Sequence, residues 1–383
     1  MKIERVTVRH VRAGLRTTLR TATLERMESD SIVVEVTTED GVSGFGEGVP
    51  REYVTGETPR TCFETLRPAG EGLLGARCGS FAEAAELAGE LGFGPDPLRP
   101  QCAARSGLEL ALLDAAGRVF DVPLARLIEF LPDLVSIAHA RDEVRYGVVM
   151  SMGSSGLSAV GRRLYGFRDV KLKVGPEVER EAEFVARMRR WLGRGMDVRV
   201  DANGSWPCAD VPKIMRRLEK SGVSWVEQPV SPAEAMSLAE IRHKCPIPVM
   251  LDESLVSERD AQLAIDGKLC DAFNLRISKN GGMIPLLRLA RLAIDNRMGI
   301  QLGCHPGETS ILSAAGRAVA CSVRDLLYLE GSYDRHLLRR RLTEEDITFG
   351  RGGRARRLRG PGLGVTVRRA ELETDTVERL EIG

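Results

Sequence analysis

Between residues 169 and 254, four short motifs each close an apolar, β-branched run. They read Asp-Val-Lys-Leu-Lys at 169–173, Val-Asp-Ala-Asn at 200–203, Val-Glu-Gln-Pro at 226–229 and Leu-Asp-Glu-Ser at 251–254. The polar residues that end these runs recur every 25 to 28 residues, and the same spacing continues to Lys279, His305 and Glu330. One strand, one helix and two loops occupy about that length in a closed eight-strand barrel. The sequence therefore predicts an α/β fold, a (β/α)8 TIM-like barrel whose strand ends carry the chemistry.

Three of these strand ends are carboxylates, Asp201, Glu227 and Asp252. The carboxyl ends of parallel strands meet at one mouth of a barrel, so we expect the three side chains to lie close together. A set of hard oxygen ligands suits Mg²⁺, with Mn²⁺ as a second possibility. A single acid at a strand end is more often a helix cap, but three acids at the same regular spacing favour a metal site.

Lysines lie on either side of these acids. Lys171 and Lys173 are two residues apart on one predicted strand, so their side chains point to the same face. A second cation nearby lowers the pKa of a lysine, which allows it to act as a base. Lys279 ends the sixth run, and we expect it to face Lys173 across the mouth. A planar enolate between them could lose a proton on one side and gain one on the other. One-base chemistry with an electrostatic partner, or a solvated charge pair, stays open.

The N-terminal third has a different pattern. Predicted strands at 3–11, 31–36 and 42–46 precede helical patterns at about 58–75, 80–92 and 103–118, which together describe an α+β unit. The polar stretch Arg16–Asp30 lacks a clean period and is predicted to be a long loop. Residues 53–57 are predicted to form a second exposed loop.

Composition narrows the class of protein. Of 383 residues, 43% are hydrophobic and 28% charged, and the net charge is +1, so we expect neither nucleic acid nor a membrane surface as a partner. No run approaches the roughly 20 apolar residues of a membrane span, and the N-terminus has no signal-peptide core. The eight cysteines contain no Cys-x-x-Cys pair, which predicts free thiols in a cytoplasmic protein.

Together these motifs resemble the enolase superfamily, and within it the muconate-lactonizing enzyme and dipeptide epimerase branch. The residues that carry the resemblance are Lys171-x-Lys173, Asp201-x-Asn203, Glu227, Asp252 and Lys279-Asn280-Gly281-Gly282. The resemblance implies a modified barrel at 140–350, preceded by an α+β capping domain at 1–130 whose loops close over the mouth. It also implies that residues 355–383 return to the cap, and that the protein is a homo-oligomer that binds a small carboxylate.

Five positions are candidates for substrate contacts. His305 ends the seventh run, where a site role and a structural role are both open. Glu308 and Glu330 resemble acids that follow the seventh and eighth strands in the family, although Tyr328 replaces the first acid of the epimerases' Asp-x-Asp-Gly segment. In the two predicted cap loops, Arg20 and Tyr53 could meet a distal group of the substrate.

These residues predict a Mg²⁺-dependent enzyme that takes the proton α to a carboxylate through an enolate intermediate. We favour an isomerase that epimerises or racemises a dipeptide or an N-acyl amino acid with two lysines. Cycloisomerisation of a muconate-like lactone and β-elimination, as in o-succinylbenzoate synthase, are the alternatives. A non-catalytic binding protein on an enzyme fold would leave both lysine motifs and all three acids without a role.

Overall fold

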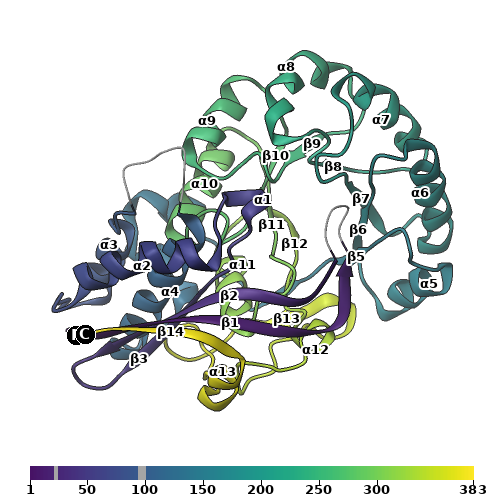
Figure 1. Ribbon diagram of the computed structural model, residues 1–383. Coiled ribbons are helices and arrows are strands. Elements are labelled where there is room, and N and C mark those ends of the chain that lie inside the picture. Colours follow the sequence, from purple (N-terminus) through teal and green to yellow (C-terminus); the bar gives the residue numbers. More distant parts are fainter. Residues whose placement is uncertain (21–24, 94–100) are drawn as a thin grey trace.

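The computed structural model describes residues 1–20, 25–93 and 101–383. A four-stranded sheet with helices lies beside a ring of eight strands surrounded by helices (Figure 1). The predicted fold class, a modified barrel with an N-terminal α+β cap, is confirmed. The division at 1–130, 140–350 and 355–383 stays a prediction. No helix in the described ranges is both long and apolar enough to cross a membrane.

The cap sheet has the strand order β14-β1-β2-β3. Its strands are β1 (Ile3–Arg20), β2 (Glu25–Thr38), β3 (Ser43–Gly48) and β14 (Thr376–Ile382). β14 pairs antiparallel with β1, so the C-terminal end of the chain lies against the N-terminal sheet. The cap helices are α1 (Glu52–Thr55), α2 (Pro59–Leu73), α3 (Phe81–Gly89) and α4 (Cys102–Val119).

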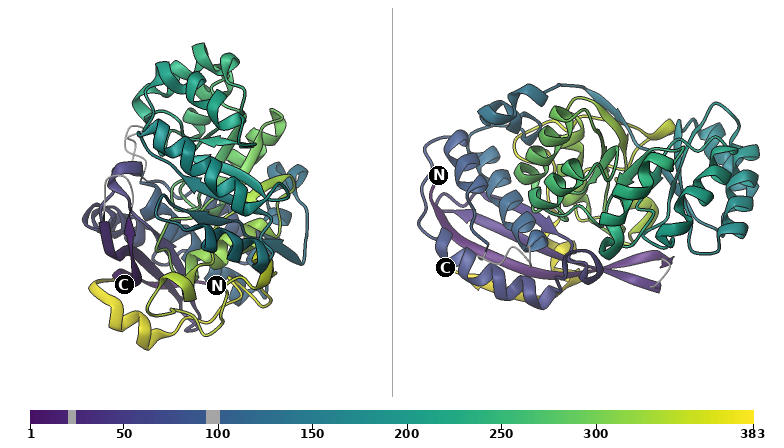
Figure 2. Two further views of the ribbon diagram at one scale, coloured as in Figure 1. Left: turned by 90° about the vertical axis from the view of Figure 1, so that its right-hand side faces the viewer. Right: turned by 90° about the horizontal axis from the view of Figure 1, so that it is seen from above.

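Two predictions for the cap loops were wrong. Within the predicted loop Arg16–Asp30, residues 16–20 continue β1 and residues 25–30 continue β2, and both strands reach beyond the rest of the cap sheet (Figure 2). Residues 21–24 of that prediction lie outside the described residues. Leu19 pairs with Arg26 and Arg20 with Glu25 through backbone groups, so this pairing does not require apolar side chains, and the ladder is interrupted between Gly14 and Leu19. Part of the second predicted loop is the short helix α1, which ends at Gly56 with a left-handed φ of 73°.

Helix α4 is buried on almost all sides and packs directly on β3. Glycines at alternate positions of β3 allow this close approach. A Cβ atom added at Gly46 would lie 2.1 Å from the carbonyl oxygen of Gly107. The inward side chains of the sheet pack on α4 and belong to one hydrophobic core that continues into the barrel.

The barrel strands run parallel in the order β5 to β12, and the chain also passes through a small two-stranded sheet. The barrel strands are β5 (Val148–Met150), β6 (Asp169–Lys173), β7 (Asp197–Asp201), β8 (Val226–Glu227), β9 (Val249–Leu251), β10 (Ala272–Leu275), β11 (Gly299–Leu302) and β12 (Leu326–Leu329). The ring closes where the amide of Gly147 donates to the carbonyl of Leu329 at 2.8 Å. β10 ends at Leu275, so the predicted strand end at Lys279 was wrong.

The remaining elements lie between and around these strands. The longer helices are α5 (Gly156–Tyr165), α6 (Val178–Leu192), α7 (Val211–Glu219), α9 (Glu258–Asp266), α10 (Met283–Asp295), α11 (Ser310–Ala320) and α13 (Arg369–Asp375). The short ones are α8 (Leu238–Ile241), α12 (Asp334–Leu337), η1 (Leu124–Phe130), η2 (Pro132–Ile137), η3 (Cys208–Asp210), η4 (Pro232–Ser237), η5 (Arg242–Lys244) and η6 (Arg351–Gly353). The small sheet pairs β4 (Glu143–Arg145) with β13 (Arg354–Arg356).

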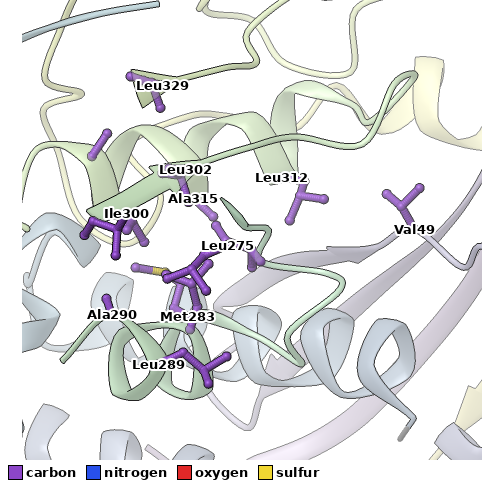
Figure 3. Packing of buried hydrophobic residues seen from close by; sticks show 14 of the residues in the cluster. Val49, Leu275, Met283, Leu289, Ala290, Ile300, Leu302, Leu312, Ala315 and Leu329 are labelled. Atoms are coloured by element: carbon purple, nitrogen blue, oxygen red, sulfur yellow. The ribbon is translucent and has the colours of Figure 1, made fainter. Parts of the chain in front are cut away.

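Successive side chains along a barrel strand point alternately outward, toward the helices, and inward, into the ring. Figure 3 shows Leu275 and Leu302 packed near α10 residues such as Met283, outside the ring. Their neighbours Asn274 and Gln301 point the other way, into the barrel, and donate to Glu227. This alternation places polar side chains inside the ring at the height of the predicted site.

Buried acids join the cap to one side of the barrel. Glu109 of α4 accepts hydrogen bonds from the first amides of α10, those of Met283 and Ile284. Glu47 of β3 accepts from Thr309 and from the Leu312 amide at the start of α11. Negative side chains at helix N-termini complement the helix dipole. The cap is therefore anchored over the β10–β11 side of the mouth.

Candidate active site

Lys171 lies one layer below the strand ends, inside the barrel. Its ammonium group donates to Glu330 at 2.8 Å and to Glu227 at 3.2 Å, and Asp201 lies 3.6 Å away. Burial alone would lower the pKa of Lys171, but Glu227, Glu330 and Asp201 together hold it above its ordinary value. This position makes Lys171 a counter-ion that fixes the acids above it.

Lys173 is the last residue of β6 and reaches the mouth. Its Nζ donates to Asn203 Oδ1 at 3.0 Å and lies 3.6 Å from Asp201 Oδ2. The side chain is 28% exposed, compared with 3% for Lys171. The two lysines point to the same side of β6 as predicted, but only Lys173 is open to a small molecule.

Asp201, Glu227 and Asp252 are completely or almost completely buried at adjacent strand ends. Asp201 Oδ2 has no hydrogen-bond partner. Burial alone would raise the pKa of Asp201, but Lys173 and Lys171 hold it below its ordinary value. Three carboxylates on successive strands, one with an oxygen that accepts no hydrogen bond, match the donor chemistry of Mg²⁺.

The acids are nevertheless paired with protein cations. Lys171 contacts Glu227, while Asp252 accepts from Arg276 and from Lys279. Across residues 1–20, 25–93 and 101–383, no three Asp, Glu, His or Cys side chains form a ready-made metal cluster. A bound metal therefore has to compete with these ion pairs for the same oxygens.

Lys279 does not lie where the sequence predicted it. It follows β10 by four residues, and its side chain is fully buried. Its Nζ donates to the carbonyl oxygens of Asp252 and Asn274, both at 2.7 Å, and to Asp252 Oδ1 at 2.8 Å. All three ammonium protons are thus used between the ends of β9 and β10. Burial, with Arg276 nearby, lowers the pKa of Lys279 well below its ordinary value, but its fully buried Nζ with three acceptors is not open to a small molecule in the way that Lys173 is.

His305 and Glu308 form a compact turn after β11. Glu308 accepts from the His305 amide at 2.9 Å and from Ser313 Oγ at 2.8 Å. Burial raises the pKa of Glu308 to about 8. Burial, with Arg276 and Arg51 nearby, lowers the pKa of His305 well below its ordinary value, and its Nδ1 has no partner. Glu308 is held by its own loop, whereas His305 keeps an unused ring nitrogen.

Glu330 lies directly after β12, in the layer of Lys171. One oxygen accepts from Lys171 and the other from Arg199 at 2.7 Å. Burial alone would raise the pKa of Glu330, but Lys171 and Arg199 lower it to about 2. Both oxygens are occupied below the mouth, so the position does not support the predicted substrate contact.

The two cap candidates come from α1 and β1. Tyr53 lies on α1 with 53% of its surface exposed. Arg20 ends β1, and its side chain lies outside the described part of the chain. Next to Tyr53, Arg51 is buried and donates to Ser29 Oγ and to the Pro306 carbonyl. Arg51 thereby ties the start of α1 to the loop after β11.

Sequence reasoning missed several residues that shape the site. These are Arg51, Arg199, Asn274, Arg276 and Gln301. A polar residue between apolar neighbours was an available signal for three of them, because Arg199, Asn274 and Gln301 interrupt runs of apolar residues in their strands. Arg276 gave no such signal, because Lys279, three residues later, is the residue that matches the regular spacing of the strand ends.

Two family models match the chain, and together they span both parts of the fold. Residues 3–129 match the mandelate racemase / muconate lactonizing enzyme N-terminal domain. Residues 157–371, more than half of the chain, match the enolase C-terminal domain-like family. The protein belongs to the enolase superfamily. The branch predicted from the lysine and carboxylate motifs is confirmed by these matches.

Characterised relatives of this superfamily member are isomerases. An N-succinyl-L-Arg/Lys racemase from Bacillus cereus is 28% identical over 342 residues, 86% of this chain and 87% of the racemase. Muconate cycloisomerase 1 from Pseudomonas putida is 28% identical over 358 residues, 90% of each chain. The predicted enzyme class, an isomerase of the enolase superfamily, is confirmed.

Solved structures give the same picture. An N-succinyl Arg/Lys racemase from Bacillus cereus matches with a TM-score of 0.87 at 25% identity, over 100% of both chains. A dipeptide epimerase from Enterococcus faecalis, in complex with Mg and the dipeptide L-Leu-L-Tyr, has the same fold, with a TM-score of 0.85 at 24% identity over 96% and 100% of the two chains. Magnesium is thus found with a dipeptide in an enzyme of this fold.

Proposed function

We propose that this protein is a Mg²⁺-dependent isomerase that removes the proton α to a carboxylate with Lys173. One observation carries the proposal. Lys173 is a lysine at the end of β6, open to the mouth, whose Nζ lies 3.6 Å from the buried carboxylate of Asp201. A base must come within reach of carbon and also lie beside the groups that stabilise the resulting anion.

Asp201, Glu227 and Asp252 would hold Mg²⁺, which supplies positive charge beside the substrate carboxylate. Lys173 takes the α-proton, and the electron pair moves into the carboxylate to give an enolate. Lys171, buried behind the acids, keeps them oriented and supplies a fixed positive charge below them. Mn²⁺ in place of Mg²⁺ stays a prediction.

For the substrate we propose a dipeptide or an N-acyl amino acid. Several relatives act on such compounds by name, among them the N-succinyl-L-Arg/Lys racemase and a hydrophobic dipeptide epimerase. Epimerisation or racemisation is the second step that these names suggest. Cycloisomerisation or β-elimination is the alternative, favoured by the burial of Lys279 and by the likeness to muconate cycloisomerase.

Deuterium uptake tests the proposed function. The protein is incubated in D₂O with Mg²⁺ and pools of dipeptides, N-acyl amino acids and N-succinyl amino acids, and mass spectra are recorded. We expect a one-unit mass gain in one compound class, lost with excess EDTA and in Lys173→Ala. No gain in any pool would remove the proposed substrate class, and lactones and sugar acids would be the next pools.

Two further predictions concern the whole protein. A homo-oligomer is predicted, and light scattering coupled to gel filtration would measure its mass. A cytoplasmic location is also predicted, and fractionation of the source cells would check it.

A further inference from the structure

The two sides of the mouth carry different cations. β6 and β10 are four strands apart in a ring of eight, so their ends lie on opposite sides of the barrel. Lys173 ends β6. On β10, Asn274 points into the ring and donates to Glu227, and Arg276 follows two residues later. The period of two along an extended chain brings Arg276 to the same inner side.

The contacts of Arg276 agree with this placement. Its guanidinium donates to Asp252 Oδ2, one of the proposed metal ligands. The side chain is 9% exposed, and its Nε has no hydrogen-bond partner. Arg276 therefore holds a buried, unused donor at the mouth. Lys279, in contrast, is 0% exposed and has an acceptor for each of its three protons.

We propose that Arg276, and not Lys279, faces Lys173 across the mouth, so that the enzyme has a lysine base on one face of its substrate only. The inference rests on the proposed function and deepens it. A guanidinium offers five donors and no acceptor, so it does not take a proton from carbon. Its free Nε–H instead donates to an anionic oxygen of the substrate, which orients the α-carbon toward Lys173.

The chemistry follows from this asymmetry. Lys173 removes the α-proton from its own face, and the electron pair moves into the carboxylate. The same ammonium group returns a proton to the same face, which exchanges hydrogen with retention of configuration. Alternatively, the electron pair returns to carbon and expels a β-substituent or opens a ring bond, so that cycloisomerisation and β-elimination need no second base. Only one configuration at the α-carbon presents its hydrogen to Lys173.

The first test separates the configurations. Each enantiomer or epimer of the compound found by deuterium uptake is incubated alone in D₂O with Mg²⁺. Chiral chromatography with mass detection then measures the configuration and the deuterium content of the compound. We expect exchange in one configuration at least 100-fold faster than in the other, with no interconversion. Arg276→Lys keeps the charge and adds a second base, and we expect it to gain interconversion. Interconversion of both configurations at similar rates by the unaltered enzyme would overturn the proposal and leave the proposed function standing.

The second test does not depend on activity. A brief pulse of an amine-acylating reagent is applied to the folded, Mg²⁺-loaded protein, and peptides are quantified by mass spectrometry. We expect Lys173 to react at least tenfold faster than Lys279, and the lysine introduced by Arg276→Lys to react as well. Equal labelling in denatured protein is the control. Labelling of Lys279 as fast as Lys173 would overturn the placement, even if no substrate exchanges and the proposed function fails.

Discussion

Each of two opposite sides of the barrel mouth carries a lysine near a strand end, but one lysine is partly exposed and the other is fully buried. On the β6–β7 side, Lys173 is the last residue of its strand, is 28% exposed and contacts one amide oxygen. On the β9–β10 side, Lys279 is fully buried and bound to two carbonyls and a carboxylate. The first side is open and able to react. The second side is closed and holds the barrel together.

The cap explains much of this difference. Glu109 of α4 binds the start of α10. Ser278, next to Lys279, donates to and accepts from the backbone of Val49. The loop after β10 is therefore enclosed between the barrel and the cap, and a lysine there has to find its partners inside the protein. A lysine motif alone does not distinguish a base from a structural cation.

The largest effect is expected at Lys173. In Lys173→Ala the base is removed, so α-proton exchange should fall by about 10³-fold or more, near the upper range for general bases. The unfolding free energy should change by less than about 1 kcal/mol, because Lys173 is partly exposed and Lys171 remains 3.6 Å from Asp201 in the variant. Deuterium exchange and guanidinium denaturation measure the two quantities. Unchanged exchange would remove the base assignment.

Lys279→Met is the matched substitution on the closed side. It leaves Asp252 Oδ1 and two buried carbonyl oxygens without the Lys279 donor, so the unfolding free energy should fall by about 3–5 kcal/mol. Denaturation of this variant beside Lys173→Met is the comparison, because both replace a lysine by an apolar side chain of similar length. Equal, small losses in the two variants would mean that the two sides do not differ in the way described.

Glu330, in the layer below the two sides of the mouth, should make the stability of the fold depend on pH. Its pKa of about 2 in the folded state lies below its ordinary value of 4.5. Glu330 therefore stabilises the fold above pH 4.5, and this contribution, about 3 kcal/mol, is lost as the pH falls toward 2. Glu330→Gln should lose stability at pH 7 but show a shallower decline below pH 4.5. Urea denaturation at pH 7 and pH 3 measures both, and a parallel decline in the two proteins would contradict the assignment.

The smallest effect is expected at Tyr53, on the surface of α1. Tyr53→Ala should leave the unfolding free energy within about 0.5 kcal/mol. If Tyr53 contacts bound substrate, KM should rise by up to about tenfold with kcat unchanged, as expected for a contact equal in ground and transition states. Steady-state kinetics on the identified substrate measure both constants. A fall in kcat with constant KM would point to a different role.

Regular spacing made the barrel predictable. Polar residues such as Asp201 and Glu227 end apolar strands at nearly constant intervals, and a closed barrel brings such ends together whatever the details of packing. The cap hairpin was not predictable in the same way. The residues whose exposure the structure describes at its far end, 16–18 and 26–28, are exposed or half-buried, and the backbone pairing of β1 with β2 leaves little trace in side-chain hydrophobicity.

The sequence by itself determined the barrel, the family and the three acids with Lys173 at one mouth, because these depend on which residue ends each strand. Only the tertiary structure decided that β10 stops at Leu275, that Lys279 bonds between the ends of β9 and β10, and that Arg276 takes the inner position. Both side chains are buried, and a difference of three residues in the loop after β10 decides which of them points into the ring.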